Sequence, residues 1–145
     1  MKQSWLFDAS SIFTLVRELR GEAPDKLAEG STLSLAYYEL GNALWRECFL
    51  LKRISQEEAE SSLRAMFEIL AAMDVVLLEN EEEGIAVLCK VCEFGLTFYD
   101  SAYVAQALKS KKILVTDDKK LAQAAEQAGV KTLTSKAFMG VNQMK

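Results

Sequence analysis

Short apolar runs alternate with longer segments of helical periodicity along most of the chain. In the longer segments apolar residues recur three and four positions apart, which is typical of a helix with one buried face. The short runs are rich in aliphatic and β-branched residues, which is typical of buried strands. The predicted strands cover residues 4–7, 32–33, 74–78, 112–115 and 130–133. The predicted helices cover residues 9–20, 34–51, 55–73, 80–93, 98–109 and 119–128.

This alternation of strands and helices predicts an α/β fold. We expect a single domain over residues 1–145, with a mostly parallel sheet of about four to five short strands and helices on both faces. Ser55 and Glu58 fit a capping box at the start of one helix. Residues 21–30, which contain Pro24, are expected to form a loop with at most a helical turn around Lys26 and Leu27, and the tail from Ser135 to form a frayed helix or coil.

The composition fits a globular protein and excludes several classes. Half of the 145 residues are apolar and 26% are charged, and the net charge is −4, so bulk charge does not indicate a nucleic-acid binder. No apolar run approaches the roughly 20 residues of a membrane-spanning helix, and residues 1–15 lack a signal-peptide pattern. We therefore expect a cytoplasmic protein that does not enter a membrane.

The chain contains no histidine. This excludes Ser-His-Asp and Cys-His catalysis, zinc sites with histidine ligands and a histidine general base. Any chemistry must use carboxylates, hydroxyls, lysines, thiols or metal ions.

Two of the three cysteines form a CxxC motif, Cys89 and Cys92. With Ile85 and Leu88 they occupy one apolar helical stripe, and a fourth zinc ligand is lacking. We interpret these thiols as buried and structural, rather than as a redox or zinc centre.

Acidic residues follow two predicted strands directly. Asp8 comes after residues 4–7, and the pair Asp117–Asp118 comes after residues 112–115. Each is also well placed to cap the next helix, which is the simpler explanation for a single acid at such a position. In an open parallel sheet, however, the carboxyl ends of the strands are where ligands bind.

Two further acids lie in helices. Glu39 is inside a predicted helix among Leu35, Ala36 and Ala43, where capping cannot explain it and burial of a carboxylate costs free energy. The alternative is a side chain at the edge of the apolar stripe that reaches water or pairs with Arg46. Asp100 fits a capping pattern, three residues after Thr97, yet it also starts an inward-facing stripe.

These acids are predicted to converge at one edge of the sheet. Gathered carboxylates raise one another's pKa, and a divalent cation relieves that repulsion. Oxygen ligands without histidine or cysteine favour Mg²⁺ or Mn²⁺ over zinc.

Four motifs in order along nearly the whole chain resemble the PIN domain family, and within it the VapC-like toxins of toxin–antitoxin pairs. FDASSIF resembles the opening strand with its first Asp and the Ser that follows. YYELGNAL resembles the helix with the Glu, and FYDSAYVAQA the helix with the third acid. LVTDDKKLAQAA resembles the T-x-D turn with the fourth.

The resemblance implies four catalytic and metal-binding acids, Asp8, Glu39, Asp100 and Asp118. Asp118 fills the T-x-D position after Thr116, which leaves Asp117 at the variable position with its role open. Ser10 and Thr116 are implied as supporting polar groups. The implied activity is a Mg²⁺- or Mn²⁺-dependent endoribonuclease with one or two ions, in which Glu39 either ligates a second ion or orients water.

The family also implies partners: an RNA substrate, a small antitoxin, and a second copy in a homodimer. Apolar helix residues such as Leu50, Leu51 and Met66 give indirect support for a dimer surface, and the alternative is that the core of a chain of this size absorbs them. The candidates for contact with RNA or a partner are Arg46, Lys119 and Lys120, with Arg17 and Arg20 as further possibilities. Three other lysines precede a strand and should lie at its opposite end, on a solvated surface: Lys109, Lys111 and Lys112.

Other classes remain as alternatives. The first is a PIN-like module that binds RNA or protein without cleaving, although the full set of acids argues against it. A haloacid-dehalogenase-like enzyme requires a second Asp two residues after the first, where this chain has Ser10. A receiver domain has its acid pair early in the chain, whereas here the pair comes late.

Overall fold

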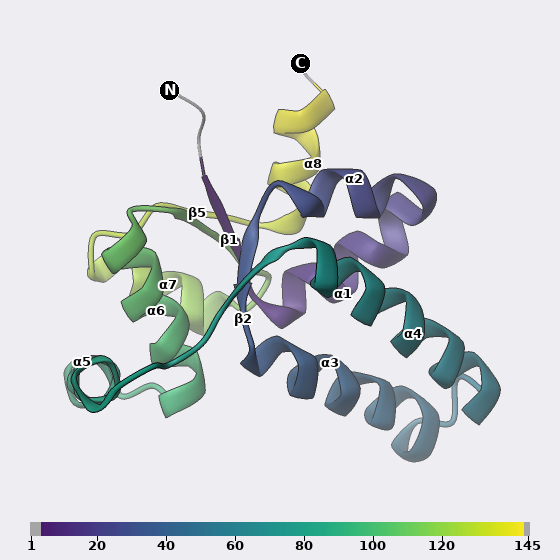
Figure 1. The fold of residues 1–145 in the computed structure, drawn as a ribbon, viewed down its shortest axis with the longest axis horizontal. Helices are drawn as coiled ribbons and strands as arrows, with labels where there is room; N and C mark the ends of the chain where they lie inside the picture. Colours follow the sequence, from purple (N-terminus) through teal and green to yellow (C-terminus); the bar gives the residue numbers. More distant parts are fainter. Residues whose placement is uncertain (1–3, 144–145) are drawn as a thin grey trace.

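The computed structural model describes residues 4–143 and contains a five-stranded, all-parallel sheet with the strand order β3-β2-β1-β4-β5 (Figure 1). The strands are β1 (Trp5–Phe7), β2 (Ser31–Leu33), β3 (Asp74–Val76), β4 (Ile113–Val115) and β5 (Thr132–Leu133). The strand order reverses direction at β1, so β1 lies in the middle and its two neighbours come from distant parts of the chain. The predicted parallel α/β architecture is confirmed.

Helices cover both faces of the sheet. The α-helices are α1 (Ala9–Leu19), α2 (Ala23–Ala28), α3 (Leu35–Trp45), α4 (Gln56–Ala72), α5 (Glu81–Phe94), α6 (Phe98–Ser110), α7 (Lys119–Gln127) and α8 (Ser135–Gln143). A 3₁₀ turn, η1 (Arg20–Glu22), precedes α2, and a π-helical segment, η2 (Arg46–Leu50), continues α3. No helix within residues 4–143 is both long and apolar enough to cross a membrane.

The alternation of side chains along β1 divides the core in two. Trp5 and Phe7 join one cluster with α1, α2, α3, α4 and α8, whereas Leu6 joins the other cluster with α5, α6 and α7. This division follows from the two-residue period of a strand. Phe138 of α8 packs edge-on against Trp5 and Phe7, with ring centroids 5.0 Å apart in both pairs.

The C-terminal segment and residues 21–30 are more ordered than the sequence indicated. The tail was predicted to be frayed or coil, but α8 is anchored because Phe138 is buried. The expected helical turn around Lys26 and Leu27 is present, but η1 and α2 together extend it over most of residues 21–30. Pro24 lies in the first turn of α2, where its missing N–H is not needed.

The helices α3 and α4 pack against each other. Leu40 and Leu70 are fully buried in this helix pair, and the capping box between Ser55 and Glu58 is present. Met66 is also buried in this core, so for this residue the core is the correct alternative and it does not contribute to a dimer surface.

The prediction that the apolar stripe of α5 is buried is wrong as well. Ile85 is 58% exposed and Leu88 is 52% exposed, and the thiols of Cys89 and Cys92 are exposed too. Only Val87 of this helix is buried, because α5 is an outer helix that packs mainly on α6. The sequence correctly predicted one apolar face, but that face lies outward.

Candidate active site

The central pair of strands brings distant segments together at the carboxyl edge of the sheet. Phe7 of β1 pairs in register with Val115 of β4, and the backbone N–H of Asp8 donates to the Val115 carbonyl at 3.2 Å. The residues that follow the two strands therefore lie side by side. They include Asp8 and Ser10 from one segment and Thr116 from the other.

Asp8 is the most enclosed acid, with 4% of its surface exposed. Its Oδ1 accepts from the Ser11 backbone N–H at 2.9 Å, so Asp8 does cap α1. The Ser10 hydroxyl donates to the same oxygen at 2.8 Å, and the Thr116 hydroxyl donates to Oδ2 at 2.5 Å. Burial raises the pKa of Asp8, and these hydrogen bonds act in the opposite direction. Capping and a role in a site are thus compatible at this residue.

Glu39 projects from the middle of α3 toward α6. The Tyr103 hydroxyl donates to its Oε1 at 2.8 Å, and no ion pair with Arg46 forms among the described residues. Burial raises the pKa of Glu39 to about 7; the Tyr103 hydrogen bond opposes the rise, and the charges of Asp8 and Asp100 add to it. This acid is therefore held in place by a neutral donor and stays close to two other carboxylates.

Asp100 lies in the first turn of α6, but its side chain does not cap the helix. Thr97 is the cap, because its hydroxyl oxygen accepts from the Asp100 backbone N–H at 3.1 Å. Burial raises the pKa of Asp100, as does the charge of Asp118, while Lys120 lowers it. Within residues 4–143 the Asp100 carboxylate accepts no hydrogen bond, so both of its oxygens are open to a ligand.

The adjacent acids Asp117 and Asp118 do different things. Asp118 caps α7 with Oδ1, which accepts from the backbone N–H groups of Lys120 at 2.9 Å and Leu121 at 3.2 Å. Asp117 accepts from the backbone N–H of Ser135 at 2.8 Å and from the Ser135 hydroxyl at 2.7 Å. Asp117 thus ties this turn to the start of α8, a structural task that the sequence left open.

The four acids Asp8, Glu39, Asp100 and Asp118 are linked by their electrostatic effects, and we call them the acid site. The charges of Asp8 and Asp100 each raise the pKa of Glu39, and the charge of Asp118 raises the pKa of Asp100. Within residues 4–143 no three acids or thiols are close enough to form a complete metal cage. Their chemistry nevertheless fits a hard divalent cation, because all the donors are oxygens and like charges face one another.

The candidate cations are divided between the site and the opposite edge. Lys120 is close enough to lower the pKa of Asp100, and Lys119 precedes it on the surface. Lys112 donates to the Ser31 hydroxyl at 2.8 Å, at the start of the strands, and Lys109 pairs with Glu83 at 3.0 Å. The prediction that Lys109 and Lys112 lie away from the acid site is confirmed, because neither contacts one of its four acids.

Two other candidate cations lie elsewhere. Arg46 is exposed on η2. Arg17 stacks over its neighbour Phe13 on α1, with 5.5 Å from the guanidinium carbon to the ring centroid. Neither therefore contacts an acid of the site in the described structure.

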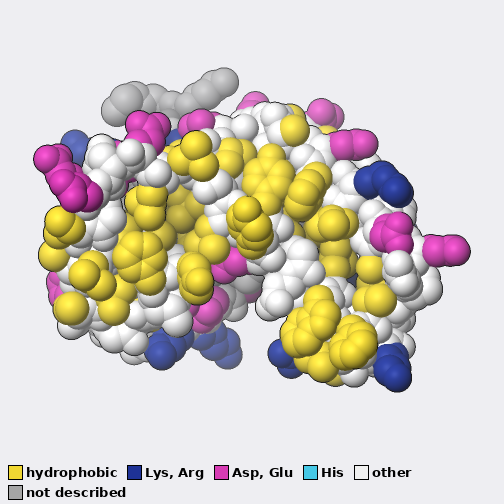
Figure 2. All heavy atoms as spheres, turned by 60° about the horizontal axis from the view of Figure 1, so that its bottom comes forward, with side chains coloured by type: hydrophobic (Ala, Val, Ile, Leu, Met, Phe, Trp, Pro, Cys, Tyr) yellow, Lys and Arg dark blue, Asp and Glu magenta, His cyan; other side chains and the backbone are white. Residues whose placement is uncertain are grey.

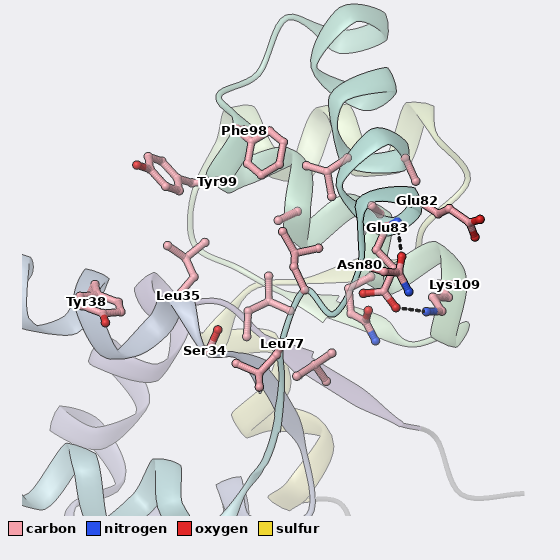
Figure 3. Close-up of a pocket in the computed structure, with 18 residues that line it drawn as sticks. Ser34, Leu35, Tyr38, Leu77, Asn80, Glu82, Glu83, Phe98, Tyr99 and Lys109 are labelled. Carbon is pink, nitrogen blue, oxygen red and sulfur yellow. Dashed lines mark hydrogen bonds and ion pairs between the residues drawn. The ribbon is translucent and has the colours of Figure 1, made fainter.

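Sequence reasoning missed an apolar groove of about 710 Å³ at the other half of the same sheet edge (Figure 3). Leu33 and Val76 form its floor at the ends of β2 and β3, and α5 and α6 form its walls. Figure 3 shows Tyr38 and Tyr99 at one end of the groove, and the Glu83–Lys109 ion pair at the other. The predicted buried strand 74–78 was the available signal: β3 ends at Val76, and Leu77 and Leu78 are exposed beside the groove.

Figure 2 views the molecule from this edge. Hydrophobic side chains extend across the face, acidic side chains lie beside a hollow near the lower margin, and basic side chains lie on both sides of that hollow.

The sheet order, the flanking helices and the acids at the carboxyl edge define an α/β fold with a carboxylate site. A family model described as the PIN domain matches residues 4–127, most of the chain. This protein belongs to the PIN domain family.

Two curated relatives come from Pyrobaculum aerophilum. The chain is 33% identical over 123 residues to Exonuclease VapC9, covering 83% of this chain and 85% of the relative. It is 36% identical over 124 residues to Ribonuclease VapC3, covering 80% of this chain and 90% of the relative.

Solved structures share the fold. The crystal structure of PAE2754 from Pyrobaculum aerophilum has a TM-score of 0.79 and 27% identity, with all of both chains covered. A DNA-bound VapBC from Salmonella typhimurium has a TM-score of 0.63 at 12% identity, covering 92% of this chain and 99% of that one, which shows similarity of fold alone.

Proposed function

We propose that this protein is a Mg²⁺- or Mn²⁺-dependent endoribonuclease that hydrolyses RNA phosphodiester bonds. The observation that carries the proposal is the gathering of four acids at the carboxyl edge of the sheet. There the charges of Asp8 and Asp100 act on Glu39, and the charge of Asp118 acts on Asp100. Such crowding is unfavourable unless a cation binds there. The names of the two curated relatives, an exonuclease and a ribonuclease, support nuclease chemistry.

Three of the acids are suited to hold one or two ions. Asp8 has both oxygens fixed by hydroxyl donors, which orients its remaining lone pairs. Asp118 uses Oδ1 as a helix cap and keeps Oδ2 for a ligand. Asp100 accepts no hydrogen bond in the described structure and contributes the most open carboxylate.

Glu39 has a different environment, and we assign it a separate role. Tyr103 fixes its carboxylate from one side, and burial raises its pKa to about 7, close to physiological pH. Glu39 is thereby suited to orient the attacking water and accept its proton, or to ligate a second ion. A bound Mg²⁺ or Mn²⁺ supplies water activation and neutralises charge on the phosphoryl oxygens.

The same proposal includes partners. We assign this chain as the toxin of a VapBC-type pair, with a small antitoxin as one partner and a second copy of the chain as another. Support comes from the VapC names of the relatives and from exposed aliphatic side chains on and before α5: Leu77, Leu78, Ile85 and Leu88. The proposed place of action is the cytoplasm, where the RNA substrate is found.

The test is a cleavage assay on the purified protein with linear and circular forms of one RNA, in Mn²⁺ or in EDTA. Cleavage of both forms only with the cation is the expected result. Cleavage of the linear form alone would make the enzyme an exonuclease and overturn the endonuclease assignment. RNA binding without cleavage of either form would favour the PIN-like binding module.

A further inference from the structure

A row of exposed aromatic side chains runs along α3 and its continuation η2. Tyr38 is 81% exposed, Trp45 is 48% exposed and Phe49 is 67% exposed. Steps of seven and four residues keep these side chains on one side of the helix. We call Tyr38, Trp45 and Phe49 the aromatic ridge.

The ridge starts one residue before Glu39, where Tyr38 stands at one end of the apolar groove, and leads away from the acid site along the helix. Tyr38 immediately precedes Glu39, whose carboxylate receives the Tyr103 hydroxyl. A helical rise of about 1.5 Å per residue places Phe49 roughly 16 Å farther along the axis. A single strand of nucleic acid that crosses the acid site and continues along α3 would therefore pass all three rings.

The far end of the ridge is basic. Three cations lie there, Arg46, Lys52 and Arg53, against a single acid, Glu47, which pairs with Arg53 at 3.4 Å. Arg46 and Lys52 form no ion pair with any described residue. In a chain whose net charge is −4, this is a local excess of positive charge. Figure 2 shows a hydrophobic cluster flanked by basic side chains at the lower right.

Aromatic faces beside cations suit single-stranded nucleic acid, because bases stack on rings while phosphates contact the basic groups. The exposed side of α5 differs in chemistry. Its large side chains, Ile85 and Leu88, are aliphatic, and acids precede and begin the helix: Glu79, Glu81, Glu82 and Glu83. Such a surface fits a protein partner and would repel phosphates.

We propose that the aromatic ridge binds the bases of single-stranded RNA next to the phosphate positioned at the acid site. This inference rests on the proposed ribonuclease function and adds the path of the substrate and the residues that hold it. Trp45 and Tyr38 are assigned as stacking residues, and Arg46 as a phosphate contact. The ridge compensates for an overall charge that disfavours RNA.

The two tryptophans give a direct readout. Trp5 is buried against Phe138, whereas Trp45 is exposed on the ridge, so RNA that stacks on the ridge quenches the emission of Trp45 alone. The probe is a mixed-sequence single-stranded RNA oligonucleotide, titrated into the wild-type protein in EDTA to prevent cleavage. We expect saturable quenching by the single strand and little by the same sequence as a duplex. Binding without any change in emission would overturn the proposal.

Variants separate stacking from general effects. Trp45→Phe should keep the affinity but lose the quenching, and Trp45→Ala or Tyr38→Ala should weaken binding by roughly 5- to 100-fold. Arg46→Gln should weaken binding and lower its dependence on salt. Arg64→Gln on the exposed surface of α4 is the matched control for Arg46→Gln and should bind RNA like the wild type.

Three further results test the ridge and the ribonuclease proposal separately. If Trp45→Ala and Tyr38→Ala bind RNA normally and change only the sedimentation mass, the ridge is a protein interface and the proposal is wrong. If they bind and cleave RNA like the wild type, the ridge has no part in substrate binding. If quenching occurs but no variant or wild-type protein cleaves RNA in Mn²⁺, the ribonuclease proposal fails while the ridge remains an RNA surface.

Discussion

The two halves of one sheet edge have opposite chemistry. At the ends of β1 and β4 the chain continues into Asp8 and into Thr116 and Asp118, and the two aspartates are half of the acid site. At the ends of β2 and β3 it continues into apolar residues such as Leu35 and Leu77, which line the apolar groove. The strands are parallel neighbours with equivalent backbone geometry. The residues that follow each strand, rather than the sheet itself, therefore decide what each half binds.

Each half of the sheet edge carries a free-energy cost in the isolated chain, and the two costs have different causes. The acid site partly buries its carboxyls and crowds like charges, and burial first and the neighbouring charges second raise the pKa values of Glu39 and Asp100. The apolar half exposes large hydrophobic side chains to water, including Leu77 and Ile85. Each cost is removed by a different ligand: a cation for the acids, and a protein surface for the apolar residues. We therefore expect a substitution in one half of the sheet edge to leave binding at the other half unchanged.

The largest effect should separate the two adjacent acids that follow β4. We expect Asp118→Asn to lower metal-dependent RNA cleavage by roughly 100-fold or more, because it removes a ligand charge while Asn still caps α7. Asp117→Asn should stay within a few-fold of the wild type, because Asp117 faces Ser135 instead. Initial cleavage rates in Mn²⁺ measure both; equal losses would erase the distinction between the two residues.

Metal binding should show as a change in stability. At about 100 times its Kd, a cation bound only to the folded state stabilises it by about 2.7 kcal/mol. We expect Mn²⁺ to raise the melting temperature of the wild type, and this rise to disappear in Asp8→Asn, which preserves the cap. Asp25→Asn on the exposed surface of α2 is the control and should keep the full rise. An equal rise in Asp8→Asn would place the ion elsewhere.

Glu39 predicts a dependence of stability on pH in the metal-free protein. Its folded pKa of about 7 lies above the ordinary value of 4.5 for a glutamate, so the protonated form favours folding. That contribution is complete below about pH 4.5 and is lost as the pH rises through 7. Glu39→Gln, which still accepts from Tyr103, should therefore gain about 1–2 kcal/mol over the wild type at pH 8, after allowance for solvent screening, and almost nothing at pH 4.5. Urea unfolding in EDTA at the two pH values checks this; a pH-independent difference would contradict it.

The apolar half should respond to charge without loss of fold. Ile85→Glu is expected to reduce the sedimentation mass from a dimer to a monomer and to change the free energy of unfolding of the monomer by less than about 0.5 kcal/mol. Ala71→Glu on the exposed face of α4 is the control and should leave the mass unchanged. A wild type that sediments as a monomer would remove the dimer from the proposed function.

The acids could be found from the sequence because their signals are local. Asp8 follows an apolar run directly, and Glu39 lies within a helix where no cap is needed. The parallel sheet then brings strand ends to one edge by a general rule. The sequence could not assign Asp117, because its partner Ser135 lies 18 residues later and the contact depends on how α8 docks.

The apolar half was harder to predict for a physical reason. Helical periodicity shows that α5 has one hydrophobic face, but it does not show whether another element covers that face. Ile85, Leu88, Cys89 and Cys92 satisfy the period of a buried stripe and yet lie on the surface. The same holds for Leu77 and Leu78, which the sequence assigned to a buried strand. Only the docking of α5 onto α6 through Val87 decides which face is covered.

The most direct test of the central claim is the cleavage of RNA by the wild type and by Asp100→Asn, in Mn²⁺ and in EDTA. Asn is nearly the same size as Asp, and the Asp100 side chain accepts no hydrogen bond in the described structure, so the fold should survive. The account predicts cleavage by the wild type only with the cation and none by the variant, with unchanged circular dichroism. Cleavage by folded Asp100→Asn at the wild-type rate would contradict the assignment of the acid site.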